Sequence, residues 1–526
     1  MRLMVRRDDA EGGAQVPRHL LKLLVLAVVG LSQVPHATVQ LAGQAPERPN
    51  IVIILADDMG WNDASFHGGE IPTPNIDRLA AEGVELNRFY TNPKCTPTRA
   101  ALLTGRDPLK LGLTYATVYP WSTFGVAVSE HFIGESFGSQ GYETAAIGKW
   151  HLGHTVPAHH PNNRGFDYFM GSLNTGGDYF THRSQGGYDL QRNGESTPEL
   201  DGQYNTDIYT SEAIRWIRNV RDKQKPFLLY VAYKAPHSPF QAPRELIDQA
   251  GGVYPAMMVS MDTGIGGILD ALEAEGVADD TIVMFLSDNG ATQGNGSNAP
   301  LRGYKLGTYE GGIRVVSVLR WPGVLAPGTV STQVMTSMDV FPTLAAATGV
   351  EVQADRALDG VDLWDEISSG RTTPRSDDIF YASETAVGRQ FSWSVLRGDM
   401  KLVQKVDQTF ESLTVVNELY DVFADPGESN NLAGDQPDLV RELVDALIAW
   451  RRQHPYAGSH ARVIPHPGWR APLDWARAMH LNGLNVNPDP ADNIYGMGQR
   501  GEPGQPSPTQ QRLDRIYDNR GRIIYR

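Results

Sequence analysis

Short runs of hydrophobic residues alternate along the chain with stretches in which hydrophobic positions recur at helical spacing. Four of the runs predict strands that are buried on both faces, because they are continuous and mostly rich in Val, Ile and Leu. They span residues 50–56, 143–147, 227–232 and 281–286, the second being the weakest. Helical patterns lie between them, at residues 75–82, 209–220 and 257–275. The alternation predicts an α/β fold with a largely parallel sheet.

A change in composition near residue 370 indicates a domain boundary, because residues 369–375 are rich in Ser, Gly, Thr, Pro and Arg. The chain beyond it predicts two short strands and a helix, at residues 391–395, 400–403 and 439–452. After about residue 465, Pro, Gly, Asn and Gln become abundant, which predicts irregular structure. We therefore expect a large domain at residues 46–372, a smaller domain at residues 373–460 and an irregular extension at residues 461–526.

The N-terminus resembles an export signal. Several Lys and Arg residues precede an apolar run at residues 23–31, which is too short to span a bilayer. Gly43 and Ala45 offer a small-x-small cleavage site. These features predict a signal peptide over residues 1–45; a disordered leader that is not exported is the alternative.

The chain contains a single cysteine, Cys95, so an intramolecular disulfide is impossible. Exported proteins without disulfides are more typical of a bacterial periplasm than of a eukaryotic secretory lumen. No second apolar run reaches transmembrane length. We therefore expect an exported protein, periplasmic or secreted, with no membrane anchor once the signal is removed.

Charge and composition narrow the possible functions. The formal net charge is −15, from 46 Lys and Arg against 61 Asp and Glu, and no segment is dense in basic residues. This argues against a nucleic-acid-binding protein. Hydrophobic residues make up 41% of the chain, which excludes a mainly disordered protein. An anionic substrate would need a local cluster of cations that overcomes the negative field of the whole protein.

Acidic and amide side chains directly follow two of the predicted strands. Asp57 and Asp58 follow the first strand, and Asp288 and Asn289 follow the last. Functional residues gather beyond the carboxyl ends of strands in α/β sheets, so we expect these side chains to meet at one edge. Their oxygens suit a hard divalent cation, Ca²⁺ or Mg²⁺. For either pair alone, the alternative is an acid that caps a turn or the next helix.

The other two predicted strands run into basic groups. Lys149 and His151 follow the strand at residues 143–147, and His237 follows the strand at residues 227–232. Taken singly, His237 is better explained as a loop histidine, and Lys149 and Lys305 as solvated lysines. The occurrence of such groups after all four strands favours a functional site.

Residues 93–106 predict a helix whose N-terminus can hold an anion. Thr96 or Thr98 can cap a helix that begins near Arg99, which would place Cys95 among free backbone amides at the positive end of the helix dipole. Arg99 adds a guanidinium group that suits an oxyanion. A lone cysteine is more often a small buried hydrophobic residue, but this position favours a reactive group.

Cys95-Thr96-Pro97-Thr98-Arg99 resembles the C-x-P-x-R signature of the type I sulfatases, in which the cysteine is oxidised after translation to formylglycine. Other segments similar to that family occur in family order, at residues 50–58, 148–153, 235–237, 287–290, 303–314, 339–344 and 419–422. The resemblance covers roughly residues 48–452. It is closest to arylsulfatase B-like members, partly through residues 178–182.

The resemblance implies a role for each candidate residue. The metal ligands, usually of one Ca²⁺, would be Asp57, Asp58, Cys95, Asp288 and Asn289. Arg99 and Lys149 would stabilise the hydrated formylglycine, and His151 would act as its base. His237 and Lys305 would contact the sulfate and the leaving oxygen. The hydrate would attack sulfur and displace the alcohol, which His237 or Lys305 could protonate. His151 would then deprotonate the second hydroxyl, so that the aldehyde re-forms and sulfate is expelled.

The resemblance also implies an alkaline-phosphatase-like fold, with a large α/β mixed-sheet domain and a smaller C-terminal α+β domain. The expected function is hydrolysis of sulfate esters. The expected partners are a sulfated glycan or small sulfate ester as substrate, and a formylglycine-generating or equivalent enzyme for maturation. Loops at residues 110–130 and 155–205, with His182 among them, and the C-terminal extension are expected to contact the substrate.

Two other functions remain open at this stage. The first is a phosphatase or phosphodiesterase of the same superfamily, whose members commonly use Thr or Ser as the nucleophile and often bind two zinc ions. The second is a non-catalytic relative that binds sulfated glycan. Cys95 and the complete set of site residues favour a sulfatase.

Overall fold

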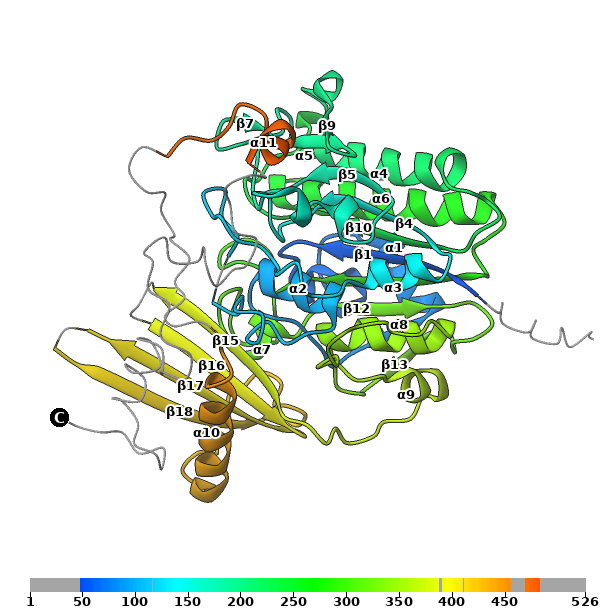
Figure 1. The fold of residues 1–526 in the computed structure, drawn as a ribbon. Helices are drawn as coiled ribbons and strands as arrows, with labels where there is room; N and C mark the ends of the chain where they lie inside the picture. The colour runs from blue at the N-terminus through cyan, green and yellow to red at the C-terminus, as the bar shows by residue number, and fades with distance from the viewer. Residues whose placement is uncertain (1–47, 116, 387–389, 410, 456–468, 483–526) are drawn as a thin grey trace, which may run out of the picture. The chain divides into compact units, whose positions relative to one another are not determined.

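The computed structural model describes residues 48–115, 117–386, 390–409, 411–455 and 469–482 (Figure 1). The predicted signal peptide lies outside these residues. A ten-stranded mixed sheet runs through the large domain. In spatial order its strands are β13 (Thr329–Ser331), β2 (Val84–Leu86), β12 (Ser317–Arg320), β11 (Thr281–Ser287), β1 (Asn50–Ala56), β10 (Phe227–Ala232), β4 (Glu143–Lys149), β5 (Tyr168–Ser172), β8 (Leu190–Arg192) and β9 (Glu195–Ser196).

All four strands predicted from the hydrophobic runs are present and adjacent, in the order β11-β1-β10-β4. They are parallel to one another and to β5, whereas β12 and β8 pair antiparallel at the two flanks. The weakest prediction, at residues 143–147, extends to Lys149 as β4. The predicted α/β fold with a large mixed sheet is therefore confirmed.

Helices cover both faces of this sheet. One face carries α2 (Cys95–Thr104), α3 (Ile133–Ser139) and α8 (Val340–Thr348). The other carries α1 (Pro74–Glu82), α4 (Asn205–Arg215) and α6 (Val253–Ala274). The last three are the predicted helices, although α4 gives way to a π-helical segment at Trp216–Val220 and α6 begins four residues earlier than predicted.

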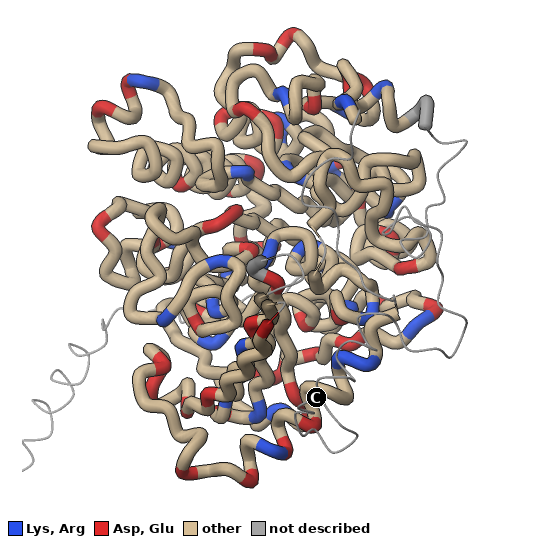
Figure 2. Tube along the Cα trace, turned by 90° about the vertical axis from the view of Figure 1, so that its left-hand side faces the viewer, with Lys and Arg blue, Asp and Glu red and all other residues tan. Residues whose placement is uncertain are grey.

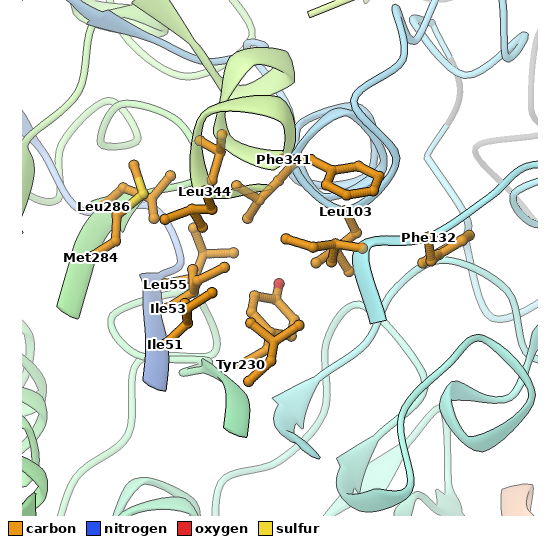
Figure 3. Packing of buried hydrophobic residues seen from close by; sticks show 14 of the residues in the cluster. Ile51, Ile53, Leu55, Leu103, Phe132, Tyr230, Met284, Leu286, Phe341 and Leu344 are labelled. Atoms are coloured by element: carbon orange, nitrogen blue, oxygen red, sulfur yellow. The ribbon is translucent and has the colours of Figure 1, made fainter. Parts of the chain in front are cut away.

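The alternation of side chains along each strand divides the hydrophobic core into two parts. Ile51, Ile53 and Leu55 of β1 point to the α2 side, where they pack with residues of neighbouring strands and helices (Figure 3). Val52 and Ile54 point to the α6 side. All five are fully buried, which stabilises the fold by roughly 1.5–3 kcal/mol for each side chain. The packed centre gives the strand ends a fixed geometry.

The smaller domain is an antiparallel sheet of β15 (Ile379–Ala386), β16 (Gln390–Arg397), β17 (Met400–Gln408) and β18 (Leu413–Asp421). The helix α10 (Pro437–Arg451), predicted at residues 439–452, packs on this sheet through Leu443, Leu447 and Trp450 (Figure 1). The predicted C-terminal α+β domain is therefore confirmed.

The sequence predicted irregular structure for residues 461–526, whereas the described part of this extension contains α11 (Trp475–Asn482). Trp475 and Met479 of α11 are buried against the large domain. Tertiary packing stabilises this short helix, which the local composition did not indicate.

The remaining elements are short and connect the larger ones. They are β3 (Phe89–Tyr90), β6 (Arg183–Ser184), β7 (Gly187–Tyr188), β14 (Met335–Thr336), α5 (Arg244–Ala250), α7 (Glu310–Ile313) and α9 (Trp364–Ser369). None of the helices in the described ranges combines the length and hydrophobicity needed to cross a membrane.

Candidate functional site

Three buried carboxylates meet where β1 and β11 end. Asp57, Asp58 and Asp288 each place one oxygen within 4.8 Å of the others, and all three side chains are almost completely buried. The Asp58 backbone N–H donates to Asp288 Oδ1 at 3.2 Å, and Asn289 Nδ2 donates to Asp58 Oδ1 at 2.7 Å. The structure thus brings together the four oxygen-bearing residues that the sequence predicted.

This group fits a hard divalent cation. Asp57 Oδ1 and Asn289 Oδ1 are buried and have no hydrogen-bond partner in the described structure, which is unusual for buried polar atoms. The donor set consists of carboxylate and amide oxygens, the ligands that Ca²⁺ and Mg²⁺ prefer. One ligand atom each of Asp57, Cys95 and His237 also lies within 4.8 Å of the other two. The cysteine is therefore adjacent to the oxygen cluster.

Three cations surround the carboxylates. The Lys149 ammonium donates to Asp57 Oδ2, and the Lys305 ammonium donates to Asp58 Oδ1. Arg99 donates to Asp288 Oδ2 from Nε at 3.2 Å and from Nη2 at 2.9 Å. Three positive charges balance three negative ones, so a bound divalent cation would leave the site net positive. The site would then attract an anion, although the net charge of the chain is −15. Figure 2 shows acidic and basic residues interspersed over the described part of the chain.

The pKa values of Asp57 and Asp288 are shifted in opposite directions. Burial alone would raise the pKa of Asp57, but Lys149, His237 and Arg99 outweigh it and the pKa is lowered. Burial, followed by the charge of Asp57, raises the pKa of Asp288. A charged Asp288 is therefore costly beside Asp57, and a cation between the two carboxylates would relieve that cost.

Cys95 is the first residue of α2, so the helix begins four residues before the position expected near Arg99. Lys94 occupies the N-cap position, so neither Thr96 nor Thr98 caps the helix. Pro97 lies in the first turn, where no backbone hydrogen bond is lost. Because α2 begins at Cys95, this residue lies directly at the positive end of the helix dipole.

The two threonines have other contacts. Thr98 Oγ1 accepts from the Asn92 backbone N–H at 2.9 Å and donates to the Asn92 carbonyl at 3.1 Å, which fixes the segment before the helix. Thr96 Oγ1 lies 3.2 Å from His151 Nε2. The threonines therefore hold the segment around Cys95 in place rather than cap its helix.

The Cys95 thiol is buried and free of any disulfide. Burial raises its pKa despite Lys149 and Lys305, so the unmodified thiol would be a poor nucleophile. The Lys305 ammonium lies 3.7 Å from Cys95 Sγ. A group bound at the Cys95 position would therefore lie between the oxygen cluster and Lys305.

His151 is buried and follows β4 with a positive φ of 61°. Its Nε2 lies 3.1 Å from the Val118 carbonyl, which assigns the proton to Nε2 and leaves a lone pair on Nδ1. Nδ1 has no partner in the described structure. Burial, Lys149 and Arg99 lower its pKa well below the usual value, so His151 is a neutral imidazole able to accept a proton.

His237 follows β10 and lies at the mouth of the site, where it is partly exposed. Its Nδ1 lies 2.5 Å from the Ser238 carbonyl, and its Nε2 lies 3.8 Å from Asp58 Oδ2. Burial lowers the pKa of His237 to about 4 even though Asp57 and Asp58 oppose the change. His237 is therefore neutral near pH 7.

The backbone around the site is strained. Asp58 and Leu306 have φ values of 70° and 71°, which non-glycine residues rarely adopt. Gly148, just before Lys149, has a φ of 112°, and a Cβ there would lie 2.0 Å from the Ala232 carbonyl. Only glycine permits β4 and β10 to approach this closely, and that approach places Lys149 beside Asp57.

The smaller domain holds the loop that carries Lys305. The buried Lys401 of β17 pairs with Glu310 at 2.8 Å and with Glu428 at 3.0 Å, and the Glu310 backbone N–H donates to Glu428 Oε2 at 2.7 Å. Upstream of Lys305, Arg302 donates to the Glu428 carbonyl at 3.0 Å. The loop is thus fixed to the C-terminal sheet on both sides of Lys305.

Sequence reasoning missed two buried lysines near the site. Lys94 donates to the carbonyls of Tyr115 and Glu384, and burial lowers its pKa to about 8. Lys234 donates to the Gly177 carbonyl, and burial followed by Lys149 lowers its pKa to about 7. Their positions, directly before Cys95 and between β10 and His237, are the signal that could have revealed them.

Among the other predicted pocket residues, His182 is buried, and its Nε2 lies 3.0 Å from the Leu200 carbonyl. It lines a small pocket that also includes Asp178, Asp189, Asn205 and Lys234. The pocket lies beyond the carboxyl end of β5, on the same edge of the sheet as the carboxylates.

Comparisons with known proteins agree with this geometry. The sequence profile of the family described as Sulfatase matches residues 49–350. Arylsulfatase J of Mus musculus is 40% identical over 457 residues, covering 77% of this chain and 76% of its own length. N-acetylgalactosamine-6-sulfatase of Mus musculus is 37% identical over 384 residues, covering 68% of this chain and 72% of its own length.

A solved structure extends the likeness to the fold. The crystal structure of Ps i-CgsB in complex with k-i-k-neocarrahexaose superposes with a TM-score of 0.71 and 29% identity, covering 83% of this chain and 98% of its own. The family profile spans more than half of the chain, and the curated relatives cover more than two thirds of it. The chain therefore belongs to the sulfatase family of sulfate-ester hydrolases, as its C-x-P-x-R segment indicated.

Proposed function

We propose that this protein hydrolyses sulfate esters of a glycan, using a formylglycine made from Cys95 and one Ca²⁺ ion. The observation that carries the proposal is the position of Cys95 at the start of α2, between the buried carboxylates and the Lys305 ammonium. A buried thiol with a raised pKa does not explain such a site by its own chemistry. Conversion to formylglycine by a maturation enzyme would give that position a function.

The residues that would hold Ca²⁺ are Asp57, Asp58, Asp288 and Asn289, together with the modified Cys95 side chain. When present, the ion would supply positive charge next to a sulfate oxygen, and formylglycine would supply the nucleophilic hydroxyl that the thiol lacks. The two buried oxygens without partners support this ligand set.

Arg99 and Lys149 would fix the geometry around the nucleophile. Arg99 is fully buried, bonds Asp288, and also donates from Nη1 to the Lys149 carbonyl at 2.9 Å. This contact ties α2 to the end of β4. Both cations are therefore preorganised to stabilise negative charge that develops at the Cys95 position.

Two histidines and Lys305 would move or hold protons. Neutral His151 would accept a proton at Nδ1, the atom left free by the Val118 contact. Lys305 remains protonated because, although burial lowers its pKa, Asp58 and Cys95 raise it well above the usual value. Lys305 would bind a sulfate oxygen or the leaving oxygen, with His237 beside it at the mouth of the site.

The substrate class rests on the relatives and on the predicted export signal. The named relatives act on an aryl sulfate or on N-acetylgalactosamine-6-sulfate, and the solved structure holds a neocarrahexaose. An exported enzyme meets polymers outside the cell. A sulfated glycan built on galactose or N-acetylgalactosamine is therefore the proposed substrate.

The test is release of inorganic sulfate by purified protein that was co-expressed with a formylglycine-generating enzyme. We expect sulfate release from sulfated oligosaccharides and from 4-nitrophenyl sulfate, lost on calcium chelation. Faster cleavage of phosphate esters would favour the phosphatase alternative. Tight binding of sulfated oligosaccharides by fully converted protein without sulfate release would favour the non-catalytic alternative.

A further inference from the structure

One loop of the large domain lies directly beside the nucleophile. The Val118 backbone N–H donates to Thr96 Oγ1 at 3.2 Å, and the Val118 carbonyl lies 3.1 Å from His151 Nε2. Tyr119 follows immediately and is only half-buried. Its pKa is raised mainly by burial, and Cys95 and Lys305 also act on it, so the ring lies within the electrostatic reach of the site.

Three aromatic side chains form a cluster at this position. The rings of Tyr119 and Trp121 are stacked, with centroids 5.0 Å apart and planes 6° apart. Trp469, from the C-terminal extension, meets Trp121 edge to face at 5.8 Å. All three are half-buried. We call Tyr119, Trp121 and Trp469 the aromatic rim.

The C-terminal extension is fixed to the large domain next to this rim. The Tyr188 backbone N–H donates to the Leu473 carbonyl at 2.9 Å, and Ser196 Oγ donates to Asp474 Oδ2 at 2.7 Å. The buried Trp475 indole donates to the Ser184 carbonyl at 3.1 Å. Figure 1 shows α11 beside β7. Backbone and side-chain contacts therefore hold the extension against the loops that follow β5.

His154 connects the extension to the loop of Tyr119. Its Nε2 lies 3.2 Å from the Pro120 carbonyl, and its ring meets the Trp475 indole edge to face at 5.1 Å. Segments more than 300 residues apart in sequence thus converge beside His151. The nearby small pocket adds polar groups, Asp178 and Lys234 among them, on the same sheet edge.

We propose that the aromatic rim is a sugar-binding subsite that stacks on a pyranose ring of the sulfated glycan, and that the C-terminal extension completes it by supplying Trp469. Pyranose rings have an apolar C–H face, and the electron-rich face of an aromatic ring attracts it. The rim borders the site, so a ring stacked there would lie next to the sulfate at Cys95. The inference rests on the proposed function.

Three variants test the rim: two delete a ring, and the third disturbs the segment that carries Trp469. Trp121→Ala and Trp469→Ala delete the rings. Gly187→Ala tests the docking of the extension, because a Cβ there would lie 2.0 Å from the Pro472 carbonyl. Gly434→Ala is the matched control, since a Cβ at Gly434 meets nothing within 4 Å.

The measurements are KM for a sulfated oligosaccharide, with neocarrahexaose in the panel, and kcat at saturation for 4-nitrophenyl sulfate. We expect each of the three variants to raise KM for the oligosaccharide about tenfold or more, which corresponds to about 1.4 kcal/mol. The kcat for 4-nitrophenyl sulfate should stay within about twofold of wild type. Gly434→Ala should change neither quantity.

Each other outcome overturns the inference in a recognisable way. An unchanged KM means that no sugar stacks on the rim, and a parallel loss of kcat on 4-nitrophenyl sulfate means that the extension only supports the fold. A wild-type enzyme that cleaves 4-nitrophenyl sulfate but no sulfated oligosaccharide refutes the rim and leaves the sulfatase chemistry intact. A fully converted wild type that cleaves neither refutes the proposed function itself.

Discussion

The centre of the site and its rim are built in different ways. Most central residues stand at or just beyond the ends of four adjacent parallel strands, and Cys95 and Arg99 lie in α2. Asp57, Asp288 and Arg99 are completely buried. The rim residues Tyr119 and Trp469 lie on a loop and on the C-terminal extension, and are half-buried. Rigid elements thus hold the groups that must be placed accurately, whereas a loop and the extension carry the groups that we propose contact the sugar.

Lys305 stands between these two extremes. It reaches the buried carboxylates, yet it lies on a loop that the C-terminal sheet holds through Lys401, Glu310 and Glu428. The smaller domain therefore contributes to the centre indirectly. Substitutions should have their largest effects on activity at the centre, smaller effects at the groups that support Lys305, and the smallest effects at Lys234 in the small pocket.

Replacement of the nucleophile should have the largest effect. We expect Cys95→Ala to lower kcat for sulfate release at least about 10⁴-fold, because the formylglycine precursor is lost. Thermal stability should change little, because the side chain is small. Activity within tenfold of wild type would require another nucleophile and would remove Cys95 from the centre.

Removal of the metal or of one ligand comes next. Calcium chelation should lower activity about 100-fold or more, lower the unfolding temperature, and be reversed by Ca²⁺. Asp288→Asn should weaken calcium binding, measured by calorimetry, because it removes one carboxylate from the cluster. Arg99 would lose one carboxylate partner but keep Asp57 at 3.5 Å. Asp270→Asn, whose side chain is 68% exposed, is the control and should leave calcium binding unchanged. Full activity in chelator would contradict the metal site.

The support of Lys305 is tested at Lys401. Lys401→Met leaves the buried Glu428 without its cation and leaves Glu310 with Arg314 at 3.5 Å. We therefore expect a loss of about 3–5 kcal/mol in the free energy of unfolding and about a tenfold fall in kcat. Lys405→Met removes a 40% exposed ammonium from the same strand and should cost at most about 1 kcal/mol. If stability falls but kcat does not, the sheet stabilises the fold without positioning Lys305.

The smallest effect is expected at Lys234, which lines the small pocket on the same edge of the sheet. Burial and Lys149 lower the pKa of this lysine from its usual 10.5 to about 7, so the folded protein binds fewer protons than the unfolded chain between these pH values. The contribution of Lys234 to stability should therefore rise as the pH increases from about 7 to about 10.

Unfolding free energies of wild type and Lys234→Met across this range test that sign. The difference, wild type minus variant, should increase with pH by about 1–3 kcal/mol. Lys225→Met, at a 56% exposed position, should show no such trend. A difference that stays constant would mean that Lys234 keeps an ordinary pKa in the folded protein.

The sequence predicted the centre well because local patterns determine it. Each strand was visible as a hydrophobic run, and Asp57, Lys149, His237 and Asp288 follow or end those runs. The predicted start of the helix near Arg99 was wrong, because Thr96 and Thr98 are residue types that often cap helices. In the structure α2 begins at Cys95, and the hydroxyls of Thr98 and Thr96 contact Asn92 and His151.

Features that depend on distant contacts were not predicted. Lys401 pairs with Glu310 across 91 positions, and no local pattern marks either residue as buried. The helix α11 lies in a stretch whose composition indicates irregular structure, and it is held by Trp475 against Ser184. Local composition carries no information about such long-range partners.

The most direct test of the central claim is the mass of the peptide that contains Cys95, from protein purified from its native host. We expect the thiol to be replaced by an aldehyde or its hydrate, so that the peptide no longer contains the sulfur of Cys95. An unmodified thiol in a preparation that still hydrolyses sulfate esters would contradict the claim, because a buried thiol with a raised pKa would then have to act as the nucleophile itself.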